Sequence, residues 1–144
     1  MRISEVLRTK GAEVVTVTPD TDVRELVGVL SERRIGAVVV SRDGTSVDGI
    51  VSERDIVRAL AEKGAAVLAE PVTAIYTADV HSITPETQTE ELMRLMTDKR
   101  VRHVPVLVDG VLGGIVSIGD VVKHRIVELE SERAALNDYI STAR

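Results

Sequence analysis

The segment GIVSERDIVR at residues 49–58 recurs as GIVSIGDVVK at residues 114–123. In both copies a short β-branched run leads into Ser-x-x-Asp, and a helical pattern of apolar residues follows. Upstream, VTPDT at residues 17–21 matches ITPET at residues 83–87. Self-similarity of this kind is the signature of a repeated supersecondary unit. We therefore predict that the chain consists of two copies of one unit.

The match continues between these motifs at an offset of 66 positions, with Arg34 aligned to Arg100. Runs of β-branched residues bounded by turn residues predict strands, and apolar spacings of three and four predict helices. In the first unit they predict a strand at 14–17, a helix at 22–33, strands at 37–40 and 47–51, and a helix at 53–63. In the second they predict a helix at 88–99, strands at 103–108 and 111–116, and a helix from about 118. The order in each unit is β-α-β-β-α.

Neither unit alone covers both faces of a three-stranded sheet, so the two sheets are expected to bury each other. We predict an α+β fold in which two tandem repeats pack sheet to sheet about a pseudo-twofold axis. The helices lie outside, and the C-terminal helix is extended. The predicted divisions are a first repeat with its N-terminal lead-in, a linker, a second repeat with its lead-in, and a helical extension, at residues 1–63, 64–71, 72–126 and 127–144.

The composition excludes several classes of protein. The 144 residues carry a formal net charge of −5 and are 44% hydrophobic, which suits one sizeable core and disfavours nucleic-acid coating. The chain has no cysteine, which excludes disulfides, thiolate metal sites and cysteine nucleophiles. It has no apolar run of about 18 residues, and its first residues lack the apolar stretch of a signal peptide. We therefore expect a cytoplasmic protein with no membrane contact.

Ser52 and Asp55 lie where a predicted strand ends and a helix begins, and Ser117 and Asp120 occupy the matching place. At this spacing the hydroxyl and the carboxylate lie on one side of the junction. An ionised carboxylate there accepts both hydroxyls of a ribose, while the free N–H groups of the helix N-terminus attract phosphate. The same residue types also cap helices. The spacing alone therefore leaves a nucleoside site and a plain helix cap open.

These motifs resemble the CBS-domain pair, the tandem module named after cystathionine β-synthase and also called a Bateman module. The resemblance rests on residues 49–58, 114–122 and 102–106 and covers the chain from Ile3 to about Ile126. It implies a regulatory, energy-sensing module that binds an adenosine-containing ligand in two clefts between the repeats. AMP, ADP, ATP, NAD and S-adenosylmethionine are the expected ligands, and magnesium is expected only together with a polyphosphate.

The resemblance also implies roles for individual residues. Asp55 and Asp120 would hold ribose hydroxyls, with Ser52 and Ser117 beside them. The other ligand-binding candidates are Thr77 near Asp55, Thr9 near Asp120, Arg54, Arg102 and His103 for phosphates, and Ile118, Gly119, Gly36 and Ala37 around the clefts, with Lys10 a weaker one. Arginine suits bidentate phosphate contact. Gly119 and Gly36-Ala37 stand where the other copy has Arg54 and Arg102-His103, so we expect clefts of unequal charge.

No catalytic or metal-binding pattern occurs in the sequence. His81, His103 and His124 lack the spacing of a helical metal pair. A nucleophile elbow and a P-loop glycine pattern are both absent. We therefore predict a protein that is not an enzyme and has no metal site of its own.

The C-terminal helix leaves two interpretations open. Its apolar residues from Val122 onward are Ile126, Leu129, Leu136 and Ile140, with Arg133 in the gap. Such a stripe is typical of a helix that folds back over the core, and also of one that pairs across a homodimer or with an unidentified protein partner. CBS pairs commonly associate into flat dimers, so the resemblance favours a homodimer.

The sequence thus predicts a regulatory module that binds an adenosyl ligand and signals to a partner or through its own dimer. The alternative is a structural interaction module whose clefts are vestigial, which Gly119 and Gly36-Ala37 support. Nucleic-acid binding is a weaker alternative, because the chain is acidic and Tyr76 and Tyr139 are its only aromatic residues.

Overall fold

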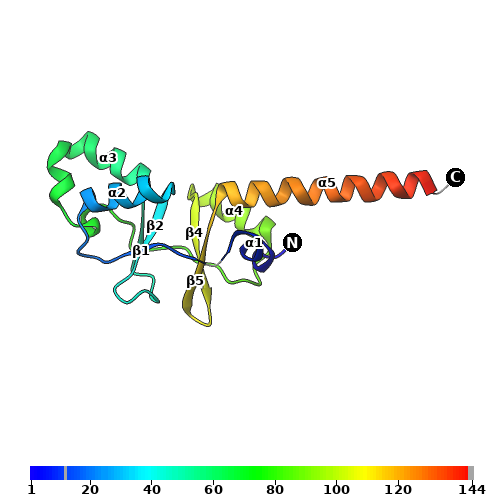
Figure 1. Ribbon diagram of the computed structural model, residues 1–144, viewed down its shortest axis with the longest axis horizontal. Coiled ribbons are helices and arrows are strands. Elements are labelled where there is room, and N and C mark those ends of the chain that lie inside the picture. Colours follow the sequence, from blue (N-terminus) through cyan, green and yellow to red (C-terminus); the bar gives the residue numbers. More distant parts are fainter. Residues whose placement is uncertain (12, 143–144) are drawn as a thin grey trace.

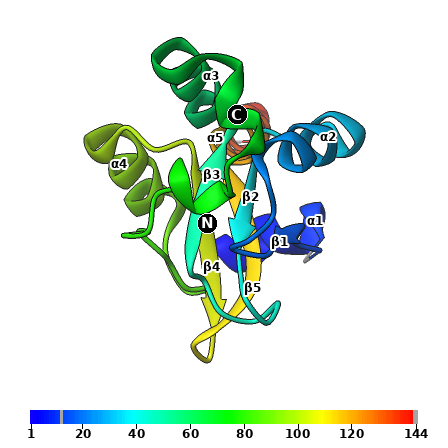
Figure 2. The ribbon, with the colours of Figure 1, turned by 90° about the vertical axis from the view of Figure 1, so that its left-hand side faces the viewer.

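The computed structural model describes residues 1–11 and 13–142 and shows two mixed helix–strand repeats side by side, with one long helix projecting from them (Figure 1). The first repeat contains β1 (Thr16–Val17), α2 (Val23–Arg33), β2 (Ala37–Val40), β3 (Gly49–Ser52) and α3 (Glu53–Lys63). The second contains α4 (Thr89–Lys99), β4 (His103–Val108), β5 (Val111–Ser117) and α5 (Ile118–Thr142). Figure 2 shows the strands of both repeats in the middle and the helices around them. The predicted α+β arrangement is confirmed.

The second repeat has a smaller sheet than the sequence predicts. In the first repeat β1 pairs in parallel with β2, and β2 pairs antiparallel with β3. In the second repeat only β4 and β5 form a ladder, and the third strand is reduced to one parallel bridge between Ile83 and Val106. The prediction of three strands in each repeat is therefore wrong for the second. The segment before Ile83, residues 78–82, has a single β-branched residue and cannot extend the pairing.

Each repeat is completed by the lead-in segment of the other repeat. The N-terminal helix α1 (Ile3–Lys10) buries Ile3 and Val6 completely in the core of the second repeat. The matching segment before the second repeat begins with the short 3-10 helix η2 (Val72–Ala74) and buries Val72 in the core of the first. The two lead-ins therefore cross, and neither core is complete without the other half of the chain.

Backbone hydrogen bonds hold the two crossings in the same way. The equivalent pairs are Ile3 N to Thr87 O (2.9 Å) and Val72 N to Thr21 O (2.8 Å), then Thr89 N to Met1 O (2.9 Å) and Val23 N to Glu70 O (2.9 Å).

The segment predicted as a linker, residues 64–71, takes part in this packing. It contains the 3-10 helix η1 (Gly64–Ala69), in which Val67 is fully buried.

Glycines at matching positions make room for the crossing segments. A Cβ on Gly49 in β3 would lie against the Tyr76 ring and 2.8 Å from Thr77 O. A Cβ on Gly114 in β5 would lie 2.7 Å from a methyl carbon of Leu7. Leu7 and Tyr76 are themselves matching residues of the two lead-ins. A side chain at either glycine therefore conflicts with the segment that crosses from the other repeat.

The C-terminal helix extends out of the body of the protein. α5 continues unbroken from Ile118 to Thr142, and Val121 is its only buried residue. Every residue from Leu129 to Thr142 is exposed, and Figure 1 shows this half of the helix beyond the repeats. The interpretation that the helix folds back over the core is therefore wrong. None of the described helices, α5 included, is both long and apolar enough to cross a membrane.

The crossing at β3 predicts opposite effects for two glycine replacements. Gly49→Ala places a methyl group against Tyr76 and Thr77, and we expect it to lower the free energy of unfolding by about 1–3 kcal/mol. Gly28→Ala is the matched control, because a Cβ there, inside α2, has no neighbour within 4 Å. It should raise stability by about 0.5–1 kcal/mol. Urea unfolding followed by circular dichroism measures both, and wild-type stability of Gly49→Ala would contradict the packing described.

Candidate functional site

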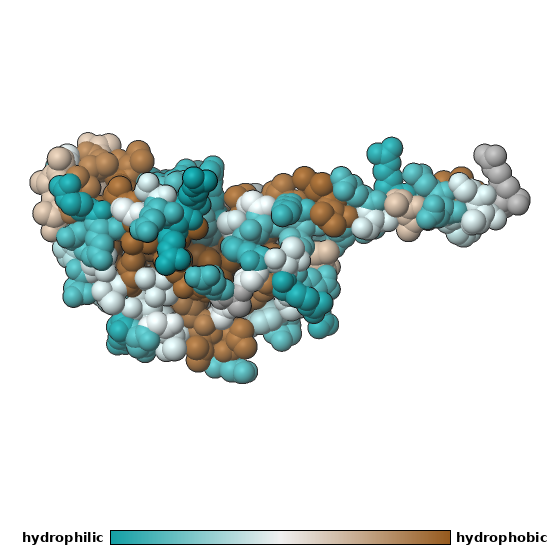
Figure 3. All heavy atoms as spheres, viewed as in Figure 1, coloured by the Kyte–Doolittle hydropathy of each residue, from teal (hydrophilic) through white to brown (hydrophobic). Residues whose placement is uncertain are grey.

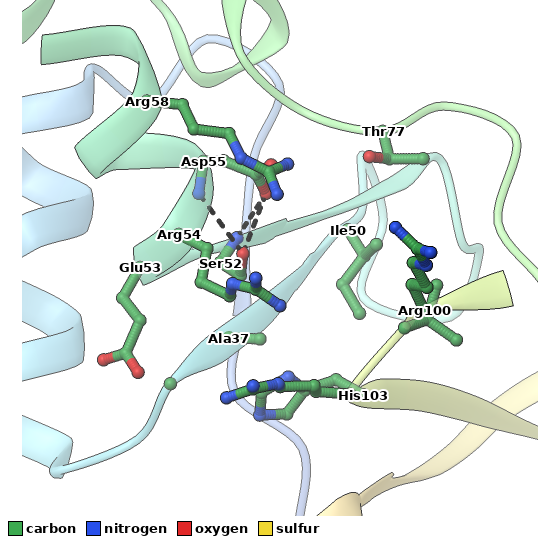
Figure 4. Close-up of a pocket in the computed structure, with 13 residues that line it drawn as sticks. Ala37, Ile50, Ser52, Glu53, Arg54, Asp55, Arg58, Thr77, Arg100 and His103 are labelled. Carbon is green, nitrogen blue, oxygen red and sulfur yellow. Dashed lines mark hydrogen bonds between the residues drawn. The ribbon is translucent and has the colours of Figure 1, made fainter. Parts of the chain in front are cut away.

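A cleft of about 210 Å³ lies where the Ser-x-x-Asp segment of the first repeat faces the start of β4 in the second (Figure 4). We refer to it as the Asp55 cleft. Its lining residues are Gly36, Ala37, Ile50, Ser52, Glu53, Arg54, Asp55, Arg58, Thr77, Arg100, Val101, Arg102 and His103. Thr77 belongs to the crossing lead-in and is held there by two 2.9 Å backbone hydrogen bonds with Ile50. Eight of the thirteen residues named from the sequence thus meet in one cleft.

Ser52 and Asp55 form a helix cap in the wall of this cleft. Ser52 donates to Asp55 Oδ2 from its backbone N at 2.8 Å and from Oγ at 3.0 Å, and Asp55 N donates to Ser52 Oγ at 3.4 Å. The cap uses one carboxylate oxygen only. Asp55 Oδ1 accepts no hydrogen bond from residues 1–11 or 13–142. The cap therefore holds the carboxylate in place and leaves one acceptor for a ligand hydroxyl.

Four arginines surround the Asp55 cleft. Arg54 and Arg58 come from α3, while Arg100 and Arg102 come from the segment between α4 and β4 (Figure 4). Within the described part of the chain none of the four is paired with a carboxylate, since the ion pairs formed by arginine involve other residues. Unpaired guanidinium groups around a concave surface attract anions and bind phosphate in a bidentate manner. The charge of these four side chains therefore suits a negatively charged group.

The second cleft contains Asp120 and lies on the other side of His103. We refer to it as the Asp120 cleft. Its lining residues are Lys10, Glu13, Val15, Arg34, Ile35, Gly36, Ala37, His103, Ile115, Ser117 and Asp120. His103, Gly36 and Ala37 thus line both clefts. A Cβ on Gly36 would lie 3.4 Å from the His103 ring. The backbone at Gly36 in the first repeat and the His103 ring in the second therefore lie close together between the two clefts.

The Asp120 carboxylate is already occupied by a side chain of the protein. Ser117 N and Oγ donate to Asp120 Oδ2 at 2.8 and 2.9 Å, as in the other cap. Lys10 Nζ donates to the same oxygen at 2.6 Å and to Ile115 O at 2.7 Å. Burial raises the pKa of Asp120, but the hydrogen bonds from Lys10 and Ser117 outweigh it and leave the pKa below its usual value. An internal ammonium group therefore stands where a ligand hydroxyl would approach.

Thr9 does not line the Asp120 cleft, and its predicted place near Asp120 is taken by Lys10. α1 stays helical through Lys10, and Thr9 Oγ1 donates back to Glu5 O at 3.4 Å. Thr9 lies inside this helix, and no backbone bridge like that between Thr77 and Ile50 joins it to β5 within the described residues. The Lys10 ammonium instead binds Ile115 O, the carbonyl that matches Ile50 O.

Ile118 and Gly119 also lie outside both the Asp55 cleft and the Asp120 cleft. They line a shallow apolar groove along the first turns of α5, together with Arg102, Val122, Lys123, Ile126 and Val127. Arg102 therefore touches the Asp55 cleft on one side and this groove on the other. We refer to it below as the α5 groove.

Burial and a neighbouring cation control the state of His103. Burial lowers the pKa of His103, and Lys10 lowers it further, against the opposite effect of Glu53 and Asp120. The unliganded imidazole is thus neutral around pH 7 and accepts or donates a hydrogen bond toward either cleft. Across residues 1–11 and 13–142, no three histidine or carboxylate side chains converge in a group suited to a metal ion.

The sequence interpretation overlooked Arg58, Arg100 and Arg34. Arg34 and Arg100 end α2 and α4 in the left-handed conformation, with φ of 53° and 54°. Glycine is the usual residue at such a helix end, and a larger side chain there is strained. Each of the two lines the cleft formed with the opposite repeat's Ser-x-x-Asp segment. Their alignment at an offset of 66 residues was the signal that could have identified them.

Comparisons with known proteins agree with this architecture. The CBS domain family matches the chain twice, over residues 3–62 and 72–126. The mitochondrial CBS domain-containing protein CBSX3 of Arabidopsis thaliana is 36% identical over 146 residues, covering 96% of this chain and 71% of that protein. The chain therefore belongs to the CBS-domain family, as its motifs predict.

Solved structures show the same arrangement of two repeats. A CBS-domain-containing protein from Agrobacterium tumefaciens is 46% identical, with a TM-score of 0.84, covering 87% of this chain and 99% of that one. A CBS domain protein from Pyrobaculum aerophilum, solved in complex with AMP, is 29% identical, with a TM-score of 0.77, covering 90% of this chain and 97% of that one. These similarities confirm the tandem fold.

Arg34 and Arg100 both have positive φ, so we predict that replacing either one by glycine stabilises the protein. Arg34→Gly and Arg100→Gly should each raise the free energy of unfolding by about 1 kcal/mol, because the strain at positive φ is removed. The control is Arg33→Gly, one residue earlier inside α2, where glycine should cost about 1 kcal/mol of helix stability. Urea unfolding of the three variants measures these differences, and destabilisation by all three would contradict the strain at Arg34 and Arg100.

Proposed function

We propose that the protein is a cytoplasmic, non-catalytic regulatory module that senses cellular energy state by binding a phosphate-bearing adenosyl ligand in the Asp55 cleft. The observation that carries this proposal is the set of four arginines without carboxylate partners around a fixed Asp55 carboxylate with one free oxygen. The carboxylate would accept ribose hydroxyls, and the arginines with His103 would bind phosphate. The AMP complex of the related Pyrobaculum aerophilum protein supports the same class of ligand.

Charge selects among the adenosyl ligands. AMP, ADP and ATP bring increasing negative charge to the four arginines, and NAD brings a pyrophosphate. S-adenosylmethionine carries a sulfonium cation and no phosphate, so the cleft is less suited to it. Magnesium enters only with a polyphosphate, since Glu53 and Asp55 are the only acidic residues that line the cleft.

The two clefts have different roles in this proposal. The Asp55 cleft binds first, because a ligand in the Asp120 cleft has to displace Lys10 from Asp120 and from Ile115 O. Signalling runs through Arg102, which lines both the Asp55 cleft and the α5 groove. A phosphate that binds Arg102 changes the charge and shape of that groove, and so alters association with a second copy or with a protein partner.

An interaction module with vestigial clefts is the second candidate. The observation that favours it is the Lys10–Asp120 contact, in which the protein's own ammonium group binds one of the two carboxylates expected to hold ribose. This candidate predicts a folded protein that no adenosyl ligand stabilises.

Thermal unfolding separates the two candidates. Circular dichroism is followed on heating, with and without AMP, ADP, ATP with and without magnesium, NAD and S-adenosylmethionine. A ligand that binds only the folded protein adds about 2.7 kcal/mol at 100 times its Kd, and so raises the midpoint by several degrees. We expect the phosphate-bearing ligands to raise it and S-adenosylmethionine to raise it least. A well-folded protein that none of them stabilises would exclude the sensor function and favour the interaction module.

Variants of the two clefts assign the site. Asp55→Asn keeps an oxygen for the Ser52 cap but removes the charge that binds ribose, and should weaken binding by about 10- to 100-fold. Asp120→Asn is the matched control at the cleft where Lys10 binds the carboxylate, and should leave this affinity unchanged. Arg100→Gly should weaken binding while it stabilises the free protein, whereas Arg34→Gly should only stabilise. Equal effects of the two aspartate variants on calorimetric titrations would contradict the assignment.

A further inference from the structure

The His103 side chain lies between the two clefts and lines both of them. A Cβ on Gly36 would lie 3.4 Å from its Cε1 and Nε2 atoms, so the edge of the ring faces the backbone of the first repeat. Figure 4 shows His103 across the Asp55 cleft from Ser52 and Asp55. Within the described part of the chain, no hydrogen bond to the ring fixes its protonation state. The charge of His103 therefore responds to what occupies either cleft.

Charged groups face His103 from both clefts. Those of the Asp55 cleft are Glu53, Arg54, Asp55, Arg58, Arg100 and Arg102. Those of the Asp120 cleft are Lys10, Glu13, Arg34 and Asp120, and Figure 3 shows strongly hydrophilic atoms where the two repeats meet. Burial, Lys10 and Arg102 lower the pKa of His103, while Glu53 and Asp120 raise it. Lys10 in one cleft thus helps to keep neutral an imidazole that also lines the other.

A bound diphosphate leaves the Asp55 cleft short of positive charge. The four arginines of the cleft exceed Glu53 and Asp55 by two charges. A nucleoside monophosphate dianion balances this excess, whereas a nucleoside diphosphate carries about three negative charges. A negative charge within about 4–6 Å favours the protonated form of an imidazole. A proton on His103 supplies the missing charge in the wall of the cleft.

We propose that a nucleoside diphosphate binds in the Asp55 cleft together with a proton on His103, and that Lys10 in the Asp120 cleft opposes this proton uptake. The inference rests on the proposed function and deepens it, because it assigns a regulation of the same site. A ligand that displaces Lys10 from Asp120 moves the ammonium group away from His103, and so strengthens diphosphate binding in the other cleft. One imidazole then couples the two clefts without a change of fold.

The affinity for ADP should rise as the pH falls from 8 toward 6. In the free protein the pKa of His103 lies below its usual value, and a bound phosphate raises it, so binding takes up a proton between the two values. For one proton the affinity changes by at most about tenfold per pH unit. At pH 8, where the imidazole is neutral with and without ligand, the affinity no longer depends on the other cleft, and Asp120→Asn is a neutral control there.

Nuclear magnetic resonance of the His103 ring tests the effect of Lys10 without any ligand. The Cε1–H signal, identified by its loss in His103→Gln, is followed while the pH is varied. Lys10→Met removes the ammonium group but keeps an unbranched side chain, and should raise the pKa of His103. Lys63→Met is the matched control, because it removes the same charge from the last turn of α3, where the lysine lines neither cleft. A His103 titration that Lys10→Met leaves unchanged would overturn the coupling.

Calorimetric titration with ADP, without magnesium, tests the proton uptake. It is carried out in two buffers of different ionisation enthalpy, and the difference in heat gives the number of protons taken up. The terminal phosphate of ADP itself titrates near pH 6, at about the value of other phosphate monoesters. The uptake that belongs to His103 is therefore the difference between the wild type and His103→Gln. We expect a positive difference at pH 7, and circular dichroism checks that each variant is folded.

A double-mutant cycle of Lys10→Met and His103→Gln isolates the path through the imidazole. Lys10→Met should move the pH dependence of ADP affinity to higher pH when His103 is present, and should not move it in the His103→Gln background. The same shift in both backgrounds, or equal proton uptake by the wild type and His103→Gln, would overturn this inference and leave the proposed function intact. Absence of ADP binding at every pH would also overturn it, but only if AMP, ATP and NAD fail to bind as well is the proposed function overturned.

Discussion

The crossing of the two lead-in segments is the constraint on which the rest of the structure depends. Ile3 and Val6 complete the core of the second repeat, and Val72 completes that of the first. Gly49 and Gly114 lie where the crossing segments approach β3 and β5 too closely for a Cβ. Because each core contains residues from the other half of the chain, neither small sheet has a complete core of its own.

The same crossing creates both clefts and makes them unequal. Each cleft combines a Ser-x-x-Asp cap from one repeat with a left-handed arginine from the other, and a lead-in lies beside the cap. The second lead-in becomes extended after η2, so it places the small Thr77 beside Asp55 and leaves space. The first lead-in stays helical to Lys10, so it places an ammonium group on Asp120. One difference in helix length therefore separates a cleft whose carboxylate has a free oxygen from one whose carboxylate is bound by Lys10.

The sequence was sufficient for what depends on local pattern and duplication. The two repeats, most helix bounds and both Ser-x-x-Asp caps follow from periodicity and from the matched motifs. The composition of the site could be seen only in the structure. Nothing in the local sequence indicates that Arg58 and Arg100 face one cleft, or that Lys10, rather than Thr9, reaches Asp120. The Arg34–Arg100 match marked both arginines as part of the repeat, and the structure then placed each of them in a cleft.

Arg102 connects the chemistry of the clefts with the geometry of α5. It precedes β4, so the strand that forms the wall of the Asp55 cleft also sets one edge of the α5 groove. Its guanidinium has no carboxylate partner within the described residues, so neither surface satisfies it in the free protein. A ligand phosphate in the Asp55 cleft would supply such a partner, and it would at the same time change the charge that Arg102 presents to the α5 groove.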